Sequence, residues 1–143
     1  MKKRIIVLSI CTLLFLPLIS FPSVADPAPE LAIRLVGGLP IPILFHYVGG
    51  AISNIGDAAA YNISYSLTLR GGILETTNKT INGNTEEILP QHAYAVGIVN
   101  AYGFGRVTLT LQVTASNAAN VTETVQGLQL GGFTWIPFSW IKP

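Results

Sequence analysis

Cysteine is almost missing from this chain of 143 residues. Its one cysteine, Cys11, stands in an apolar run near the start, and residues 26–143 contain none. Disulfide scaffolds and zinc ribbons need several cysteines, and a thiol enzyme needs a nucleophilic one. The sequence after residue 25 therefore excludes these three classes.

Charged residues are also few, at 10% of the sequence. Three of the eight basic residues stand at positions 2–4, so residues 26–143 keep five basic residues against seven acidic ones, a formal charge of −2. Recognition of phosphates needs clustered lysines and arginines. The five that remain are scattered along the chain, at Arg34, Arg70, Lys79, Arg106 and Lys142. An electrostatic binder of nucleic acid is therefore excluded.

Helical periodicity is absent after the N-terminal run, and an alternation of apolar and polar residues takes its place. Residues 61–70 and 106–114 alternate clearly, which puts one set of side chains on a buried face and the other in water. Weaker strand patterns cover residues 31–36, 41–48, 86–89, 94–99 and 121–130.

Turn-forming residues separate these segments. They occupy residues 37–38, 54–57, 71–72, 82–84, 103–105 and 117–120. This spacing predicts that residues 26–143 form a single all-β domain, a two-sheet β-sandwich of about seven strands.

The first 25 residues have the three-part pattern of a secretory signal peptide. Residues 2–4 are basic, residues 5–21 form a low-polarity run that would enter the membrane as a helix, and residues 23–25 are small. Cleavage is expected between Ala25 and Asp26. The protein is therefore expected to be secreted or held on the cell surface.

An uncleaved anchor is the alternative for the same segment. As a helix, residues 5–21 would rise about 25 Å, short of a hydrocarbon core near 30 Å. A membrane is expected as a partner only through this segment, and only if it is retained.

Four motifs stand in a characteristic order. Asn54-Ile-Gly56-Asp57 precedes the strand pattern at 61–70, Gly71-Gly72 follows it, Ile88-Leu89-Pro90 precedes the next strand, and Gly103-Phe-Gly105 opens the pattern at 106–114. Over roughly residues 44–130, this order resembles the CARDB-like group of extracellular immunoglobulin-like domains. The chain departs from that group at the corner 89–92, which lacks its glycine, and at the ending 131–140.

The resemblance implies an immunoglobulin-like sandwich of seven strands on archaeal or bacterial surface and secreted proteins, acting in adhesion or as a spacer. It implies no catalytic residues.

Three sequons would be exposed to glycosyltransfer in an exported chain. Their acceptors are Asn62, Asn78 and Asn120. Asn62 lies on the polar side of its strand pattern and the other two lie in expected turns. All three are therefore expected to be reachable, although a chain rich in Asn and Thr also produces sequons by chance.

Residues for catalysis or metal binding are sparse. The two histidines, His46 and His92, would need further ligands for a zinc or copper site. Glu86 and Glu87 are adjacent, so on a strand they point to opposite faces and cannot form a glycosidase pair. Asp57 is expected to cap its own turn. Enzyme activity, metal and cofactors are therefore not expected.

The end of the chain is rich in aromatic residues that interfaces use as anchors, namely Phe133, Trp135, Phe138 and Trp140. They either complete the core or form an exposed surface for another subunit or a glycan.

Two functions follow from these features. The first is an exported, non-enzymatic module in adhesion, coat or structural roles, with other surface proteins, glycans or itself as partner. The second is a subunit of an extracellular filament or assembly that exchanges its N-terminal segment or its aromatic tail as a strand. A small carbohydrate-binding or hydrolytic domain is a more remote third.

Overall fold

All the secondary structure in the described part of the chain is β-strand. The computed structural model describes residues 26–38, 47–73 and 78–137. Its strands are β1 (Leu31–Val36), β2 (Tyr47–Asn54), β3 (Ala60–Gly71), β4 (Lys79–Ile88), β5 (Ala93–Val99), β6 (Gly103–Thr114), β7 (Val121–Gly131) and β8 (Phe133–Trp135). The all-β prediction is confirmed, with the short β8 added to the expected seven strands. The expected signal helix lies outside the described residues.

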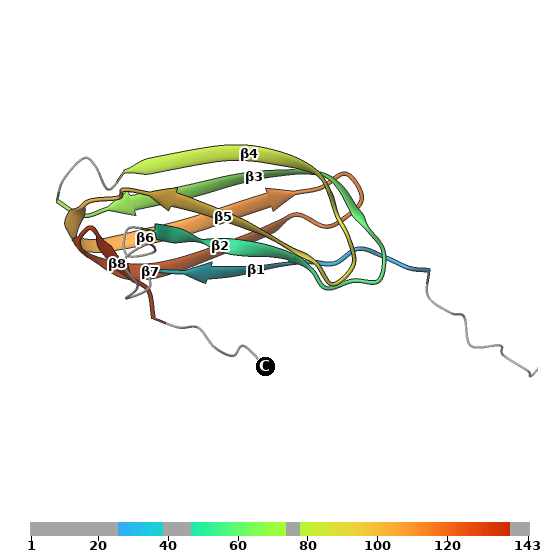
Figure 1. Cartoon of the computed structure of the whole chain (residues 1–143), viewed down its shortest axis with the longest axis horizontal. Helices are drawn as coiled ribbons and strands as arrows, with labels where there is room; N and C mark the ends of the chain where they lie inside the picture. Colours follow the sequence, from blue (N-terminus) through green and yellow to red (C-terminus); the bar gives the residue numbers. More distant parts are fainter. Residues whose placement is uncertain (1–25, 39–46, 74–77, 138–143) are drawn as a thin grey trace, which may run out of the picture.

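The strands form two antiparallel sheets that face each other as the layers of a β-sandwich (Figure 1). One sheet has the order β1-β2-β5 and the other has the order β4-β3-β6-β7-β8. Just after β1, the Gly38 amide donates a hydrogen bond to the Thr134 carbonyl of β8, with N and O 2.7 Å apart. The chain thereby connects the two sheets along one side.

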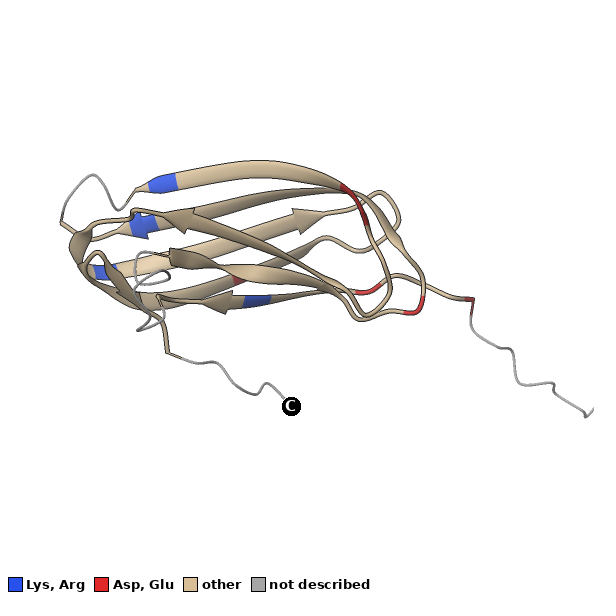
Figure 2. Ribbon diagram, viewed as in Figure 1, with Lys and Arg blue, Asp and Glu red and all other residues tan. Residues whose placement is uncertain are grey.

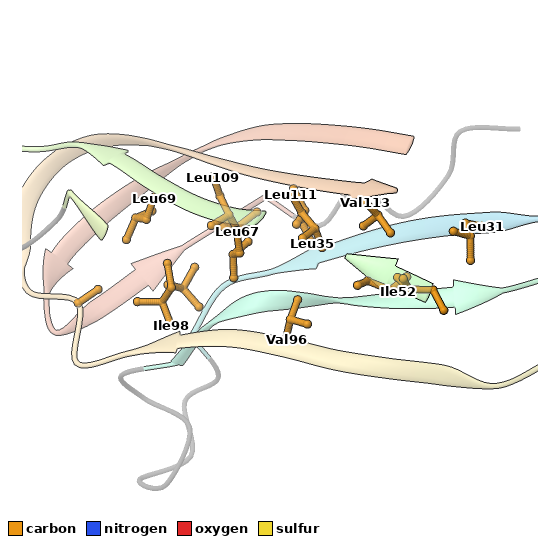
Figure 3. Packing of buried hydrophobic residues seen from close by; sticks show 14 of the residues in the cluster. Leu31, Leu35, Ile52, Leu67, Leu69, Val96, Ile98, Leu109, Leu111 and Val113 are labelled. Atoms are coloured by element: carbon orange, nitrogen blue, oxygen red, sulfur yellow. The ribbon is translucent and has the colours of Figure 1, made fainter. Parts of the chain in front are cut away.

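The core lies between the sheets and is built by the predicted alternation. On β3, Ile63, Leu67 and Leu69 have no exposed surface. Leu109 and Leu111 of β6 are buried beside them, and Figure 3 shows apolar side chains of the other sheet reaching into the same layer. Burying these apolar stripes is the main force that holds the layers together.

The segment Asn82-Gly83-Asn84 is not the predicted turn, because it lies inside β4. Gly83 pairs with Tyr65 of β3, and the Tyr65 ring lies so close that a Cβ at position 83 would overlap its hydroxyl. The Tyr65 ring in turn packs against the tilted ring of Tyr94 on β5, with the two ring centroids 5.9 Å apart. Glycine here makes room for a cross-strand aromatic ring rather than bending the chain.

Two more boundaries differ from the prediction. Residues 103–105 begin β6 rather than forming a turn, and Gly103 is buried opposite Gly131 of β7. β2 continues through Gly49 and Gly50 to Asn54, beyond the expected end at residue 48. Residues 41–46 of that expected strand lie outside the described part. In both places a neighbouring strand supplies the pairing that overrides the preference of glycine for turns.

Tyr47 covers the glycines of the three-stranded sheet. Its ring lies against Gly97, and its hydroxyl donates a hydrogen bond to the Val96 carbonyl, with the oxygens 2.7 Å apart. Burial raises the pKa of Tyr47, because the ionised phenolate would lose its solvation.

Asn54 holds three parts of the chain through its side chain and a fourth through its backbone, all at one end of the sandwich. Its side chain is fully buried, and its Oδ1 accepts hydrogen bonds from the amides of Glu30 and Gly56, each at 3.2 Å. Its Nδ2 donates to the carbonyls of Ala58 at 2.7 Å and Ile88 at 2.9 Å. The entry to β1, the turn after β2 and the end of β4 are therefore held by one amide.

The backbone of Asn54 completes this connection. Its amide donates to the His92 carbonyl at 3.0 Å, and its carbonyl accepts from the Gln91 amide at 2.8 Å. The corner between β4 and β5 is thus tied to the same residue.

Replacing Asn54 is expected to destabilise the fold strongly. Asn54→Ala leaves two amides and two carbonyls without their partner, so the free energy of unfolding should fall by about 3–5 kcal/mol in urea denaturation. Asn84→Ala, on the exposed outer side of β4, is the control and should change it by less than about 0.5 kcal/mol.

Asn54→Asp adds a test of the donor side. The carboxylate would face the carbonyls of Ala58 and Ile88, which favours its protonated form and raises its pKa in the fold above the unfolded value near 3.9. The variant should therefore be most stable below about pH 4 and lose stability as the pH rises through the higher folded pKa. A variant equally stable at acid and neutral pH would show that the two donor bonds contribute nothing.

Candidate interaction surface

The end of β7 reverses the usual order of apolar and polar side chains. Gln129 has no exposed surface, whereas its neighbours Leu128 and Leu130 are 36% and 51% exposed. A strand that buries a polar residue and exposes its apolar neighbours needs a compensating interaction inside.

Hydrogen bonds to the Gln129 side chain supply this compensation. The Thr134 hydroxyl on β8 donates to Gln129 Oε1 at 2.6 Å. Gln129 Nε2 donates to the carbonyls of Gly131 at 2.8 Å and Ala101 at 3.3 Å. Because a shift by one residue would move every side chain to the other face, these bonds fix the register that turns the leucines outward.

The aromatic end of the chain is divided by this register. Thr134 and Ile136 are buried, at 2% and 7% exposed, while Trp135 points outward and is 52% exposed. Phe133 is partly buried. Phe138 and Trp140 lie outside the described residues. One stripe of the tail therefore completes the core, and the opposite stripe contributes to the surface.

The outward residues form what we call the aromatic patch, on the outer face of the five-stranded sheet. Two rows of directly paired residues build it: Phe104–Leu130–Phe133 and Arg106–Leu128–Trp135.

The neighbouring loops add apolar surface to the patch. Phe104 is 46% exposed, and the Tyr102 ring packs against it edge to face, with centroids 5.9 Å apart. The amide of the nearby Ile73 donates a hydrogen bond to the Phe104 carbonyl at 2.9 Å, and the Ile73 side chain is 82% exposed.

Most of the charged residues lie at the two ends of the sandwich, and Arg34 of β1 and Glu123 of β7 lie between them (Figure 2). Arg70 lies near the end of β3, Lys79 begins β4 and Arg106 lies near the start of β6, so antiparallel pairing brings these cations together at the aromatic patch. We call this end the basic pole. Lys79 is already engaged, because its Nζ donates to the Asn100 carbonyl at 2.6 Å and the Val99 carbonyl at 3.3 Å.

The opposite end carries the carboxylates and is called the acidic pole. Glu86 and Glu87 lie near the end of β4, Glu30 precedes β1, and Asp57 lies in the turn after β2. Asp57 Oδ1 accepts a hydrogen bond from the Ala28 amide at 2.7 Å. The sequence predicted that Asp57 would cap its own turn, whereas its carboxylate binds the segment before β1. Its carboxylate thereby fixes residues 26–30 against this pole.

Between the two poles, the polar side chains on the outer face of the five-stranded sheet are uncharged. Hydroxyl pairs Thr68–Thr80 and Thr110–Thr124 cross the strands at 3.2 and 3.1 Å between oxygens. Near the acidic pole an open depression of about 560 Å³ is lined by Ser64, Tyr65, Ser66, Asn82, Gly83, Asn84, Gln112 and Thr114. This face therefore offers hydroxyl and amide groups for hydrogen bonding.

The three sequon asparagines are all exposed. Asn62 lies on β3 in a left-handed conformation, with φ of 50°, and its Nδ2 approaches the Ser116 hydroxyl at 3.4 Å. Asn78 Oδ1 accepts a hydrogen bond from the Gly71 amide at 3.0 Å, and Asn120 lies in the loop before β7. Each acceptor is thus within reach of solvent.

Other candidate groups stay apart. His92 is exposed and its Nδ1 lies 2.9 Å from the Pro90 carbonyl, while His46 and Glu75 are outside the described residues. In residues 26–38, 47–73 and 78–137, no three His, Cys, Asp or Glu side chains gather to hold a metal ion. The same ranges contain no helix of the length and apolarity needed to cross a membrane.

Part of the aromatic patch was missed at the level of sequence. Phe104 was assigned to a turn, and Leu128 and Leu130 were read only as part of a strand pattern. The available signal was the order Gly127-Leu-Gln-Leu130, in which the stripe expected to be buried holds a glycine and a glutamine. That order indicates apolar side chains turned outward.

No family model matches the chain, and the searches of curated proteins and of solved structures give no match.

The buried pair Thr134 and Gln129 is expected to stabilise the sandwich. Thr134→Val removes the donor to Gln129 Oε1 and leaves that oxygen buried, so the free energy of unfolding should fall by about 1–3 kcal/mol. Gln129→Leu should cost a similar amount, because the Ala101 and Gly131 carbonyls lose a donor.

The double variant measures the coupling between the two side chains. Thr134→Val with Gln129→Leu should cost clearly less than the two single changes added together, by roughly 1 kcal/mol, in a cycle of urea denaturation experiments. Simple additivity would mean that the hydrogen bond does not link β7 to β8 energetically.

Proposed function

We propose that this chain is an exported, non-enzymatic immunoglobulin-like module that acts at the cell exterior in adhesion, in a coat or as a structural spacer. The observation that carries the proposal is the outer face of the five-stranded sheet. This face offers an uncharged hydroxyl and amide surface that ends in an exposed aromatic patch, and such surfaces suit contact with other surface molecules.

The order of the strands supports the immunoglobulin-like type. Such sandwiches place their first two strands in one sheet and the third and the last two of the basic seven in the other, with crossings between the sheets. Here β1, β2 and β5 form one sheet, and β3, β6 and β7 belong to the other, with β4 at its edge.

The CARDB-like resemblance belongs to the same proposal. Its Asn-x-Gly turn corresponds here to Asn54 and Gly56, and the asparagine side chain accepts the Gly56 amide while fully buried. A turn motif with such a role in the fold supports a shared architecture better than an exposed one would.

Export is the first part of the proposal to be tested. Intact-mass measurement of protein from the culture medium or the washed cell surface should give a chain beginning at Asp26, and added protease should remove the surface-bound fraction. Enzymatic removal of N-glycans should lower the mass if Asn62, Asn78 or Asn120 is occupied. Protein that stays inside the cell with residues 1–25 attached would rule out the exported role.

A second role, as a subunit of an extracellular assembly, is favoured by the placement of most basic residues at one pole and most acidic residues at the other (Figure 2). Strand exchange through the N-terminal segment or the tail containing Phe138 and Trp140 is one route to such an assembly.

Assembly should be visible in the purified exported protein. Sedimentation velocity over roughly a hundredfold concentration range should show a sedimentation coefficient that rises with concentration, since association follows mass action. Electron microscopy of the same samples separates filaments from smaller complexes. A monomer at every concentration would end the assembly role and leave the adhesion role intact.

A further inference from the structure

We propose that the basic pole with its aromatic patch binds the acidic pole of a second copy of this chain. The proposal specifies the contact for the assembly role above and rests on that role. It needs no exchange of strands, because both surfaces are already formed in the described part of one chain.

The aromatic patch has the composition of a binding surface. Phe104, Leu130 and Trp135 are each about half exposed, and Arg106 stands in the same cross-strand row as Trp135. Aromatic residues and arginine are the types that contribute most binding energy at interfaces. A second arginine, Arg70, is exposed at the end of β3 near Arg106.

The acidic pole offers matching chemistry. Tyr61 and Glu87 are directly paired between β3 and β4, so an exposed ring and a carboxylate lie side by side on one face. Ile55 and Leu89, at 50% and 48% exposed, add apolar surface close to Asp57. This pole can therefore cover apolar groups while bringing carboxylates to the two arginines.

The separation of the poles gives the contact its orientation. β4 runs from Lys79 to Ile88, so its ten residues place the ends about 30 Å apart. This distance exceeds the Debye length of about 10 Å at 0.1 M salt, so each pole acts as a separate charge. Two like poles repel each other and unlike poles attract, which favours head-to-tail contact.

Charge also distinguishes the second copy from other occupants of the patch. The tail beyond Pro137 has Lys142 as its one charged side chain, of the same sign as Arg70 and Arg106. A neutral glycan would leave both arginines without a counter-charge. Within the described residues, the acidic pole supplies carboxylates and apolar groups together.

Charge reversal at each pole tests this contact. The first variant combines Arg70→Glu with Arg106→Glu, and the second combines Glu86→Lys with Glu87→Lys. All four side chains are exposed, so both variants should unfold at the wild-type urea concentration. In sedimentation at about 0.1 M salt, each variant alone should associate at least about tenfold more weakly than wild type.

Mixing the two variants is the decisive measurement. An equimolar mixture again pairs opposite poles, so association should return to within roughly threefold of wild type. Gln112→Glu adds a charge on the outer face outside the residues that define both poles and, as the control, should leave association unchanged. Raising the salt to about 1 M should weaken the wild-type contact, because the Debye length falls to about 3 Å.

Two further variants separate this contact from the other routes. Trp135→Ser should weaken association about tenfold or more, because the patch loses its aromatic anchor. A chain that ends at Pro137 should associate as the full chain does.

Several results would overturn the proposal. If the chain ending at Pro137 no longer associates, the tail carries the assembly and the pole contact is wrong, although the assembly role stands. A mixture of charge-reversed variants that stays monomeric, or normal association of Trp135→Ser, would also reject the contact. A wild-type protein that is monomeric throughout would reject contact and assembly together.

Discussion

The buried amide of Asn54 is the interaction on which one whole end of this molecule depends. It binds the entry to β1, the turn after β2 and the end of β4, and its backbone holds the corner before β5. Those same segments carry Glu30, Asp57, Glu86 and Glu87. The acidic pole is therefore a consequence of how one buried polar side chain gathers the ends of strands, since each carboxylate is placed by a backbone bonded to Asn54 or close to it.

A second buried amide organises the opposite end in a different way. Gln129 occupies an inward position where an aliphatic side chain would suit the core, and it is satisfied by Thr134 and two carbonyls. Because Gln129 points inward, its neighbours Leu128 and Leu130 point outward. Their apolar side chains are therefore exposed instead of contributing to the core. The two poles thus differ in chemistry because each internal hydrogen-bond network selects which side chains reach solvent. A module with unlike ends is suited to directional contacts, which is the property the proposed roles require.

The strands that could be predicted are those whose two faces meet different environments along their whole length. β3 and β6 pair with each other at the centre of the five-stranded sheet, and their alternation matches the buried and exposed positions from Ile63 onward on β3, whereas Tyr61, expected inside, is exposed next to Asn62 with its positive φ. β4 was recognised only near its end, because Asn82-Gly83-Asn84 has the composition of a turn. Its extended conformation follows from its pairing with β3, whose Tyr65 ring lies against Gly83. Gly103 and Gly105 also have the composition of a turn, yet both pair with β7, and Gly105 does so with a positive φ of 110° that glycine tolerates.

Local chemistry within the sequence determined the all-β class, the position of the main strands, the reachable sequons and the presence of an aromatic ending, because these follow from side-chain type and from a period of two. Tertiary structure alone decided which aromatic and aliphatic residues share a surface, since Phe104, Leu128 and Trp135 come from three different strands. It also decided that Arg70, Lys79 and Arg106 gather at one end and Glu30, Asp57, Glu86 and Glu87 at the other. Antiparallel pairing is the physical reason, because it brings the end of one strand beside the start of the next and joins residues that are distant in sequence.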